Sequence, residues 1–133
     1  MRVVVLGAGL TGKEVARDLV ASPQVEKVFL LVLKVEATQE FVASLVTDKV
    51  EVVELNADCD DDLRAVIEKG DVVVNALFYT YNERVVRAAI AKGVHTVDLG
   101  GHIGGITETI LQLAEEAANK GVTIIPDLGV APG

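Results

Sequence analysis

Short apolar runs alternate with amphipathic stretches along the whole chain. Continuous apolar runs are typical of strands buried on both faces of a sheet, and apolar residues spaced three and four apart are typical of helices that cover such a sheet. The alternation therefore predicts a parallel sheet with helices on both faces. The expected strands are residues 2–6, 27–35, 50–55, 71–75, 94–99 and 122–125.

Helical spacing occurs in each interval between these strands. The expected helices are residues 11–21, a polar helix around 41–45, a short helix after Asp60, a helix from Asn82 to Gly93, and a helix at about 107–120. Their predicted buried positions are Val15, Ala16, Leu19 and Val20, then Phe41, Val42 and Leu45, then Leu63, Val66 and Ile67, then Val85, Val86, Ala89 and Ile90, and finally Ile110, Leu111, Ala114 and Ala117.

Residues that commonly border helices stand at several of these ends. Ser22-Pro23 ends the first helix, since proline disfavours helical backbone in the residue before it. Gly93 and Gly121 follow two later helices, as C-terminal glycines commonly do. We interpret Asp60-Asp61-Asp62 as the N-terminal cap of the short helix rather than as a metal site, because carboxylates stabilise the positive end of a helix.

Six strands joined by five helical crossovers match the doubly wound α/β fold, the Rossmann fold, with expected strand order 3-2-1-4-5-6. In this fold the ligand crevice lies at the carboxyl ends of the strands, around strands one and four. The whole of residues 1–133 is expected to form this one domain, with no second domain.

The composition narrows the class of protein further. Half of the 133 residues are hydrophobic, as a sheet covered on both faces requires. Because the net charge is −8, no basic surface is available for nucleic acid or an anionic membrane. The single cysteine, Cys59, excludes an internal disulfide and is typical of a reducing compartment. The first strand begins at residue 2 and no apolar run is long enough to span a bilayer, so we expect a cytoplasmic protein without a signal peptide.

The glycine-rich segment Gly7-Ala8-Gly9-Leu10-Thr11-Gly12 directly follows the first strand and opens the first helix. In this context a GxGxxG segment predicts dinucleotide binding: Gly7 allows the tight turn, Gly9 allows a pyrophosphate to approach the backbone, and Gly12 allows close packing of the helix on the sheet. The N–H groups at the start of the helix would then receive the phosphates. The alternative is a strand-to-helix turn that binds nothing.

Four segments together resemble one family. They are Val3-Val4-Val5-Leu6-Gly7-Ala8-Gly9, Asp71-Val72-Val73-Val74-Asn75-Ala76-Leu77, the stretch from Ala88 through His95-Thr96-Val97-Asp98-Leu99 to Gly101, and the stretch from Gly121 through Pro126-Asp127-Leu128-Gly129 to Ala131-Pro132-Gly133. This combination, over nearly the whole chain, resembles the amino-terminal domain of the saccharopine dehydrogenase family, including its lysine dehydrogenase-like members.

The resemblance implies an NAD(P)-dependent oxidoreductase acting on amino acids. In that family a second domain follows the terminal Ala-Pro-Gly segment and supplies much of the substrate pocket and often the dimer contacts. The present chain stops at that point, so we expect no efficient turnover from it alone. No residue is assigned a role in hydride transfer.

The end of the second strand departs from the usual dinucleotide pattern. An acid about 20 residues beyond the glycine motif normally accepts hydrogen bonds from the ribose hydroxyls. Val32 or Leu33 stands there instead, which would lower the affinity for NAD by about one or two decades. Lys34 would favour the 2′-phosphate of NADP, or is a solvated lysine at a strand end. Glu36 reaches the ribose only if the strand ends later than residue 35.

The loops after strands four and five depart from the family as well. Phe78 stands where the family commonly has proline, and with Tyr79 and Tyr81 it would form either a stacking surface or a plug at the crevice mouth. His102 lies in a glycine-rich loop and is interpreted as an exposed histidine rather than an acid or base. His95, at the start of a strand, is interpreted as structural.

These observations define a candidate cofactor site and no metal site. Asn56 or Asp58 would meet the adenine, residues 75–78 would face the nicotinamide half, and Asp98 is either a site residue or a loop-capping acid. The candidate binding residues are Gly7, Gly9, Leu10, Thr11, Gly12, Lys34, Glu36, Asn56, Asn75, Ala76, Leu77, Phe78 and Asp98, with NADP or NAD as the cofactor.

The apolar residues at the expected cofactor site also support an alternative. Leu31, Val32, Leu33 and Phe78 indicate either a divergent family member or an engineered or isolated Rossmann scaffold with a compromised cofactor site. Such a scaffold would self-associate through its apolar surface as a homo-oligomer. A cofactor-binding redox sensor without catalysis is a third possibility, and its partner is not identifiable from the sequence.

Overall fold

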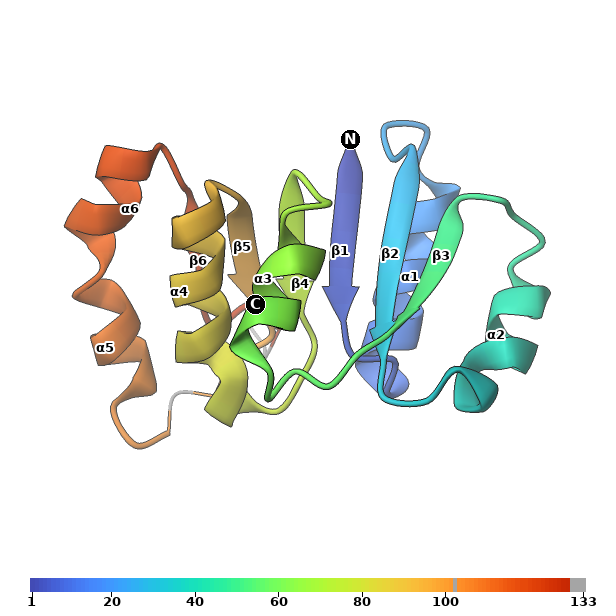
Figure 1. Ribbon diagram of the computed structural model, residues 1–133, viewed down its shortest axis with the longest axis horizontal. Coiled ribbons are helices and arrows are strands. Elements are labelled where there is room, and N and C mark those ends of the chain that lie inside the picture. The colour runs from blue at the N-terminus through green and yellow to red at the C-terminus, as the bar shows by residue number, and fades with distance from the viewer. Residues whose placement is uncertain (102, 130–133) are drawn as a thin grey trace.

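The computed structural model describes residues 1–101 and 103–129 (Figure 1). His102 and the terminal Ala131-Pro132-Gly133 segment, both singled out in the sequence, lie outside the described residues. The predicted fold is confirmed: the described chain forms a six-stranded, all-parallel sheet in the order β3-β2-β1-β4-β5-β6. The strands are β1 (Arg2–Leu6), β2 (Lys27–Val32), β3 (Val50–Glu54), β4 (Val72–Asn75), β5 (His95–Asp98) and β6 (Ile124–Ile125).

Helices cover both faces of the sheet, and Figure 1 shows α3 and α4 in front of it and α1 behind it. The α-helices are α1 (Leu10–Ala21), α2 (Gln39–Ser44), α3 (Asp60–Ile67), α4 (Asn82–Lys92), α5 (Ile106–Leu111) and α6 (Ala114–Lys120). Two 3₁₀ turns, η1 (Val35–Thr38) and η2 (Tyr79–Tyr81), lie where the chain leaves β2 and β4.

Alternate residues of the strands build two separate cores. Val3 and Val5 of β1 face α1 and α2, whereas Val4 and Leu6 face α3 and α4. All four side chains are at most 2% exposed. Because successive strand residues point to opposite faces, a fully apolar strand is the pattern of a sheet covered on both sides. The predicted buried positions of α1, α3 and α4 are found in these cores or in the one that α4 forms with α5 and α6, buried or partly buried.

The predicted single helix at 107–120 is wrong, because the chain forms two short helices there. A tight turn at Gln112 and Leu113 separates them, with the Leu113 N–H donating to the Ile110 carbonyl three residues back at 3.0 Å. The turn brings Leu113 into the core that α4 forms with α5 and α6. Leu111, predicted as buried, is 61% exposed, and Ala114 is exposed too.

The second strand ends at Val32, three residues before the predicted end. Its neighbour β3 ends beside it, in register at Glu54, and no further ladder partner follows. The chain instead turns into η1, where the Val35 N–H donates to the Glu54 carboxylate at 3.1 Å and the Thr38 hydroxyl donates to the Val35 carbonyl at 2.9 Å. Leu33 is apolar but lies on the surface, so the apolar run of the sequence extends past the end of the buried strand.

The boundaries of the other elements need smaller corrections. Strands β4 and β6 end as predicted but begin later, at Val72 and Ile124, and β5 is one residue shorter than predicted at each end. The N-cap residue of α3 is Cys59, and the three aspartates occupy the first turn, where they complement the helix dipole without a side-chain cap bond. Gly93 and Gly121 end α4 and α6 in the left-handed conformation, as predicted.

Candidate functional site

The carboxyl ends of four strands meet along one edge of the sheet. The register pairs Leu6 of β1 with Leu31 of β2 and with Asn75 of β4, and Asn75 with Asp98 of β5. The loops that leave these strands therefore start beside one another. A parallel sheet gathers its functional loops at this edge, where the topology reverses direction between β1 and β4.

A cleft of about 690 Å³ opens at this edge. Of the candidate residues, Gly7, Lys34, Asn56 and Leu77 line it. The full lining is Gly7, Ala8, Lys13, Leu31, Val32, Leu33, Lys34, Ala37, Thr38, Leu55, Asn56, Ala57, Asp58, Leu77 and Tyr81. The cleft therefore runs from the glycine turn past the ends of β2 and β3 to the start of η2 and α4.

The glycine turn has the geometry that the motif predicts. Gly7 has φ +96°, a conformation that favours glycine, and its N–H donates to the Leu31 carbonyl at 3.1 Å. A Cβ on Gly12 would overlap the Gly7 carbonyl oxygen, so a side chain there is incompatible with the close approach of helix and turn. Among the described residues, nothing beyond the adjoining backbone lies within 4 Å of a Cβ built on Gly9, so this face of the glycine is open.

The N-terminus of α1 lies beside the glycine turn. Gly9 is its N-cap residue, and no described side chain caps the helix, so its first N–H groups are available to a ligand. Leu10 and Thr11 are exposed at this end, outside the lining of the cleft. Lys13, one turn further on, does line the cleft, and its ammonium lies 5.6 Å from the centre of the Phe41 ring.

Lys13 was missed in the sequence interpretation. The signal was present, because the residue directly follows the last glycine of the motif and therefore belongs to the first turns of α1. Its side chain brings a positive charge to the cleft beside the glycine turn.

The end of β2 presents apolar groups and one cation to the cleft. Val32 is buried and Leu33 is 68% exposed, so neither offers an acceptor for ribose hydroxyls. Lys34 is exposed and lines the cleft, whereas Glu36 lies in η1, exposed and outside the lining. The neighbouring carboxylate, Glu54, is engaged by the backbone N–H of Val35.

A tight turn after β3 forms another wall. The Asn56 side-chain oxygen accepts the N–H of Asp58 at 3.0 Å, and the Asn56 carbonyl accepts the N–H of Cys59 at 3.1 Å. The Tyr81 hydroxyl donates to the Asp58 carboxylate at 2.9 Å. This hydrogen bond, together with the negative charge of Asp58, raises the pKa of Tyr81, because both favour the neutral phenol.

Asn75 organises the loop after β4. Its side chain is 1% exposed, donates to the side-chain oxygen of Asn82 at 2.9 Å and accepts the N–H of Leu77 at 3.2 Å. Asn82 in turn donates to the carbonyl of Gly100 at 3.4 Å. This buried pair joins the end of β4, the start of α4 and the loop after β5. The Ala76 backbone lies against Gly7, where an added Cβ would be 3.1 Å from the Ala76 carbonyl oxygen.

The three clustered aromatic residues do not share one position. Phe78 is 65% exposed and outside the lining of the cleft, with its ring centre 4.4 Å from that of Tyr79. Tyr79 packs so closely on Gly101 that a side chain at Gly101 would overlap it. Among these aromatics only Tyr81 lines the cleft as it is described.

Asp98 has the geometry of a loop-capping acid. It is 3% exposed, and one of its carboxylate oxygens accepts the N–H groups of Gly100 at 2.9 Å and Asp127 at 3.0 Å. It is outside the lining of the cleft. His95, at the start of the same strand, accepts the N–H of Thr123 at 3.0 Å through Nδ1. Both side chains therefore hold backbone that surrounds β5.

The described residues hold neither a metal cluster nor a membrane-spanning helix. Within residues 1–101 and 103–129, no three histidine, cysteine or acidic side chains gather as a metal site would require. No helix in that part of the chain is long and apolar enough to cross a membrane.

The chain is similar to known proteins over most of its length. Residues 3–125 match the family described as saccharopine dehydrogenase NADP binding domain. A curated relative, the saccharopine dehydrogenase [NADP(+), L-glutamate-forming] of Pyricularia oryzae, is 27% identical over 81 residues. That alignment covers 59% of this chain and 17% of the relative.

Solved structures share the fold. Apo saccharopine dehydrogenase (L-Glu forming) from Saccharomyces cerevisiae superposes with a TM-score of 0.83 at 23% identity, over 99% of this chain and 28% of that one. GenD2 from gentamicin A biosynthesis, solved in complex with NAD, has a TM-score of 0.72 at 21% identity, over 95% of this chain and 34% of that one. At these identities the likeness shows the architecture of this chain.

Proposed function

The chain belongs to the saccharopine dehydrogenase NADP-binding domain family, and from this we propose that its cleft binds a nicotinamide dinucleotide, NADP in preference to NAD. The observation that carries the proposal is the glycine turn. Gly12 permits the close contact of α1 with the turn, and the open face of Gly9 leaves the helix N-terminus accessible to a pyrophosphate.

The preference for NADP rests on charge at the ribose end. Lys13 and Lys34 line the cleft from α1 and from the segment after β2, and neither Val32 nor Leu33 supplies the carboxylate that NAD binding usually requires. A 2′-phosphate placed between two ammonium groups gains Coulomb attraction, whereas a 2′-hydroxyl at the same place gains no acceptor.

The two ends of the dinucleotide are then assigned by the direction of the cleft. We propose that the adenine lies against the turn that contains Asn56 and Asp58, and that the nicotinamide half extends along residues 75–78 toward Asp98. The lining by Asn56, Asp58 and Leu77 supports this direction. The buried bonds of Asn75 and Asp98 support a role for these two side chains in shaping the loops around the nicotinamide half.

Catalysis is a separate question from binding. The activity named for the Pyricularia oryzae relative belongs to a protein of which the aligned part is 17%. We propose that the present chain binds the cofactor of such an oxidoreductase without efficient turnover by itself. Amino-acid oxidation or reduction would then require the remainder of a full-length protein.

Self-association is the second candidate, and a specific surface favours it. Ile110, Leu111 and Ile124 belong to an apolar groove of about 230 Å³ at the β6 edge of the sheet. Leu111, Ile125 and Leu128 are exposed large hydrophobic residues in the same region of the chain. Sedimentation across a range of concentrations tests this proposal: a mass that rises with concentration supports it, and a strict monomer at high concentration contradicts it.

Calorimetric titration with NADPH and NADH at matched ionic strength tests the leading proposal. We expect micromolar binding with NADPH the tighter ligand, and Lys34→Ala to weaken NADPH by about tenfold while leaving NADH nearly unchanged. Lys92→Ala, which removes a lysine that pairs with Glu68 outside the cleft lining, is the matched control. No binding of either ligand at millimolar concentration would contradict the proposal.

A further inference from the structure

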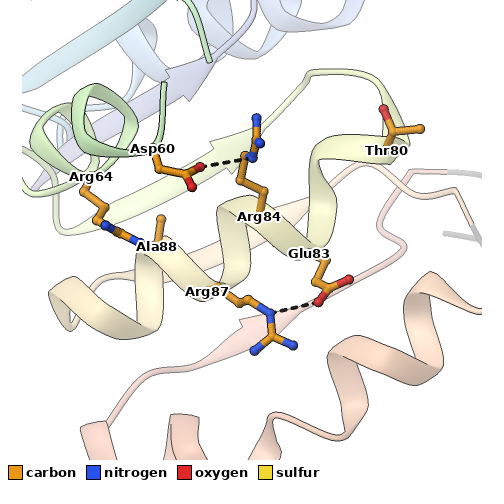
Figure 2. A pocket seen from close by; sticks show the side chains of 7 residues that line it. All are labelled: Asp60, Arg64, Thr80, Glu83, Arg84, Arg87 and Ala88. Carbon is orange, nitrogen blue, oxygen red and sulfur yellow. Dashed lines mark hydrogen bonds and ion pairs between the residues drawn. The ribbon is translucent and has the colours of Figure 1, made fainter. Parts of the chain in front are cut away.

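A second groove, of about 300 Å³, lies between α3 and α4 and adjoins the wall of the cleft formed by the turn after β3 (Figure 2). Three arginines line it, and each has a carboxylate partner: Arg64 with Asp61 at 3.4 Å, Arg87 with Glu83 at 2.8 Å, and Arg84 with Asp60 at 3.1 Å. These pairs neutralise the guanidinium groups, so the groove does not have the charge of an anion site.

Arg84 differs from the other two in what its pairing connects. Arg64 and Arg87 pair with acids three and four residues away on their own helices. Arg84 reaches from α4 to the turn after β3, at residues 56–58, and to the start of α3. Its Nη1 donates to the carbonyl oxygen of Ala57 at 3.3 Å and to the carboxylate of Asp58 at 3.4 Å, and its Nε lies 3.1 Å from the Asp60 carboxylate. Figure 2 shows its side chain directed toward Asp60 across the groove.

Tyr81 supplies a second contact to the same turn. Its hydroxyl donates to the Asp58 oxygen that Arg84 also contacts, so one carboxylate oxygen receives two donors from the start of α4. Inside the turn, Asn56 accepts the N–H groups of Asp58 and Cys59. The turn is thus held from within by Asn56 and from outside by Tyr81 and Arg84.

We propose that Arg84 and Tyr81 are positioning residues for adenosine binding, holding the turn at residues 56–58 in the conformation that receives the adenine end of the dinucleotide. This inference rests on the proposed function of the cleft. Arg84 is outside the lining of the cleft and acts through Ala57 and Asp58, which line it. Tyr81 lines the cleft as well, and its hydroxyl acts on the turn through Asp58.

The physical basis is preorganisation. An exposed loop that is free in the unliganded protein must lose backbone entropy when a ligand binds, and that loss lowers affinity. Holding the loop beforehand removes the loss. A guanidinium suits this task because its fixed fork of donors contacts several oxygens together, whereas a lysine ammonium presents a single charged group on a flexible stem.

Arg84→Gln compared with Arg87→Gln provides the test. Both variants remove a guanidinium from the same groove and the same helix, but only Arg84 contacts the turn. We expect Arg84→Gln to weaken NADPH and adenosine 2′,5′-bisphosphate by the same factor, about fivefold, and Arg87→Gln to change neither by more than about twofold. Tyr81→Phe should weaken both ligands in the same direction, less than additively with Arg84→Gln, because the two donors share one acceptor.

Amide hydrogen exchange supplies a readout that needs no ligand. Arg84→Gln should accelerate exchange at Asp58 and Cys59, whose N–H groups close the turn, while Arg87→Gln leaves both protected as in the wild type. Equal affinity of the two glutamine variants for adenosine 2′,5′-bisphosphate would overturn the positioning role even if exchange changed. A wild-type protein that binds neither NADPH nor the bisphosphate would overturn the proposed function itself, and this role with it.

Discussion

Alanine at Gly9 and alanine at Gly12 should separate ligand binding from folding within one short motif. The two glycines are three residues apart, yet their surroundings are opposite. A Cβ at Gly12 would overlap the Gly7 carbonyl oxygen and lie 2.9 Å from its carbon, whereas a Cβ at Gly9 meets nothing described within 4 Å beyond the adjoining backbone. Gly9 has φ −73°, which alanine adopts without strain.

The stability change follows from these contacts. At Gly12 the obstacle is backbone, which cannot rotate aside, so α1 must move off the turn at a cost of about 3 kcal/mol, offset by about 1 kcal/mol of better helix propensity. A net loss of about 2 kcal/mol lowers Tm by about 7 °C in a chain of this length. At Gly9 the lost cap preference and the reduced unfolded-state entropy nearly cancel, leaving a change within about 1 kcal/mol.

At Gly9, alanine should weaken ligand binding although it leaves stability nearly unchanged. A methyl group on its open face holds a pyrophosphate away from the first N–H groups of α1, and losing one charge-assisted hydrogen bond weakens NADPH by at least about tenfold. Thermal unfolding by circular dichroism and calorimetric titration with NADPH measure the two quantities. Wild-type affinity in Gly9→Ala would refute the placement of the pyrophosphate, and a wild-type Tm in Gly12→Ala would refute the packing argument.

Two pH-dependent effects are expected as well. In a Tyr79→Phe background Tyr81 is the single remaining tyrosine, and ultraviolet titration should show it ionising above the ordinary tyrosine pKa. Adding Asp58→Asn should move the transition back down, because the raised pKa depends on that carboxylate. An unchanged transition would exclude Asp58 as the cause. The backbone N–H and guanidinium of Arg2 lower the pKa of Asp71, so its contribution to stability is present above about pH 4 and is lost as the pH falls through the lowered value. Asp71→Asn should therefore reduce the free energy of unfolding by less than about 1 kcal/mol at pH 7, and not at all once the pH is below the lowered value, as measured by urea unfolding. An equal difference in both pH ranges would contradict the linkage.

The fold was predictable because its main signals are local in sequence. Each buried parallel strand is a continuous apolar run, and the helices between them bury residues at helical spacing. The errors occur where a distant residue decides. Leu33 prolongs the apolar run of β2, but the strand ends where β3 ends at Glu54. Likewise Leu111 and Ala114 fit the apolar face of a single helix. The turn at Leu113 leaves both of them exposed and buries Leu113 against α4 instead.

The candidate site likewise has a part that could be predicted from local sequence and a part that could not. The glycine motif encodes its own backbone geometry within six residues, so Gly7 and Gly12 could be assigned from sequence. The contacts of Arg84 could not, since they join α4 to a turn 26 and 27 residues earlier in the chain. No spacing rule relates two segments that meet only because β4 pairs beside β1 while α3 and α4 cover the same face.

Helix α4 carries a consequence for how the molecule comes apart. It lies between α3 and the pair α5 and α6 (Figure 1), with Val85 and Ala89 in the core against the sheet and Val86 and Ile90 in the core with α5 and α6. The strand order suggests two nucleotide-binding halves, but a cut between them would strip one side of this helix and expose its apolar residues to water. The two halves are therefore not independent folding units, and fragments divided between α3 and β4 should gain structure only when they are mixed.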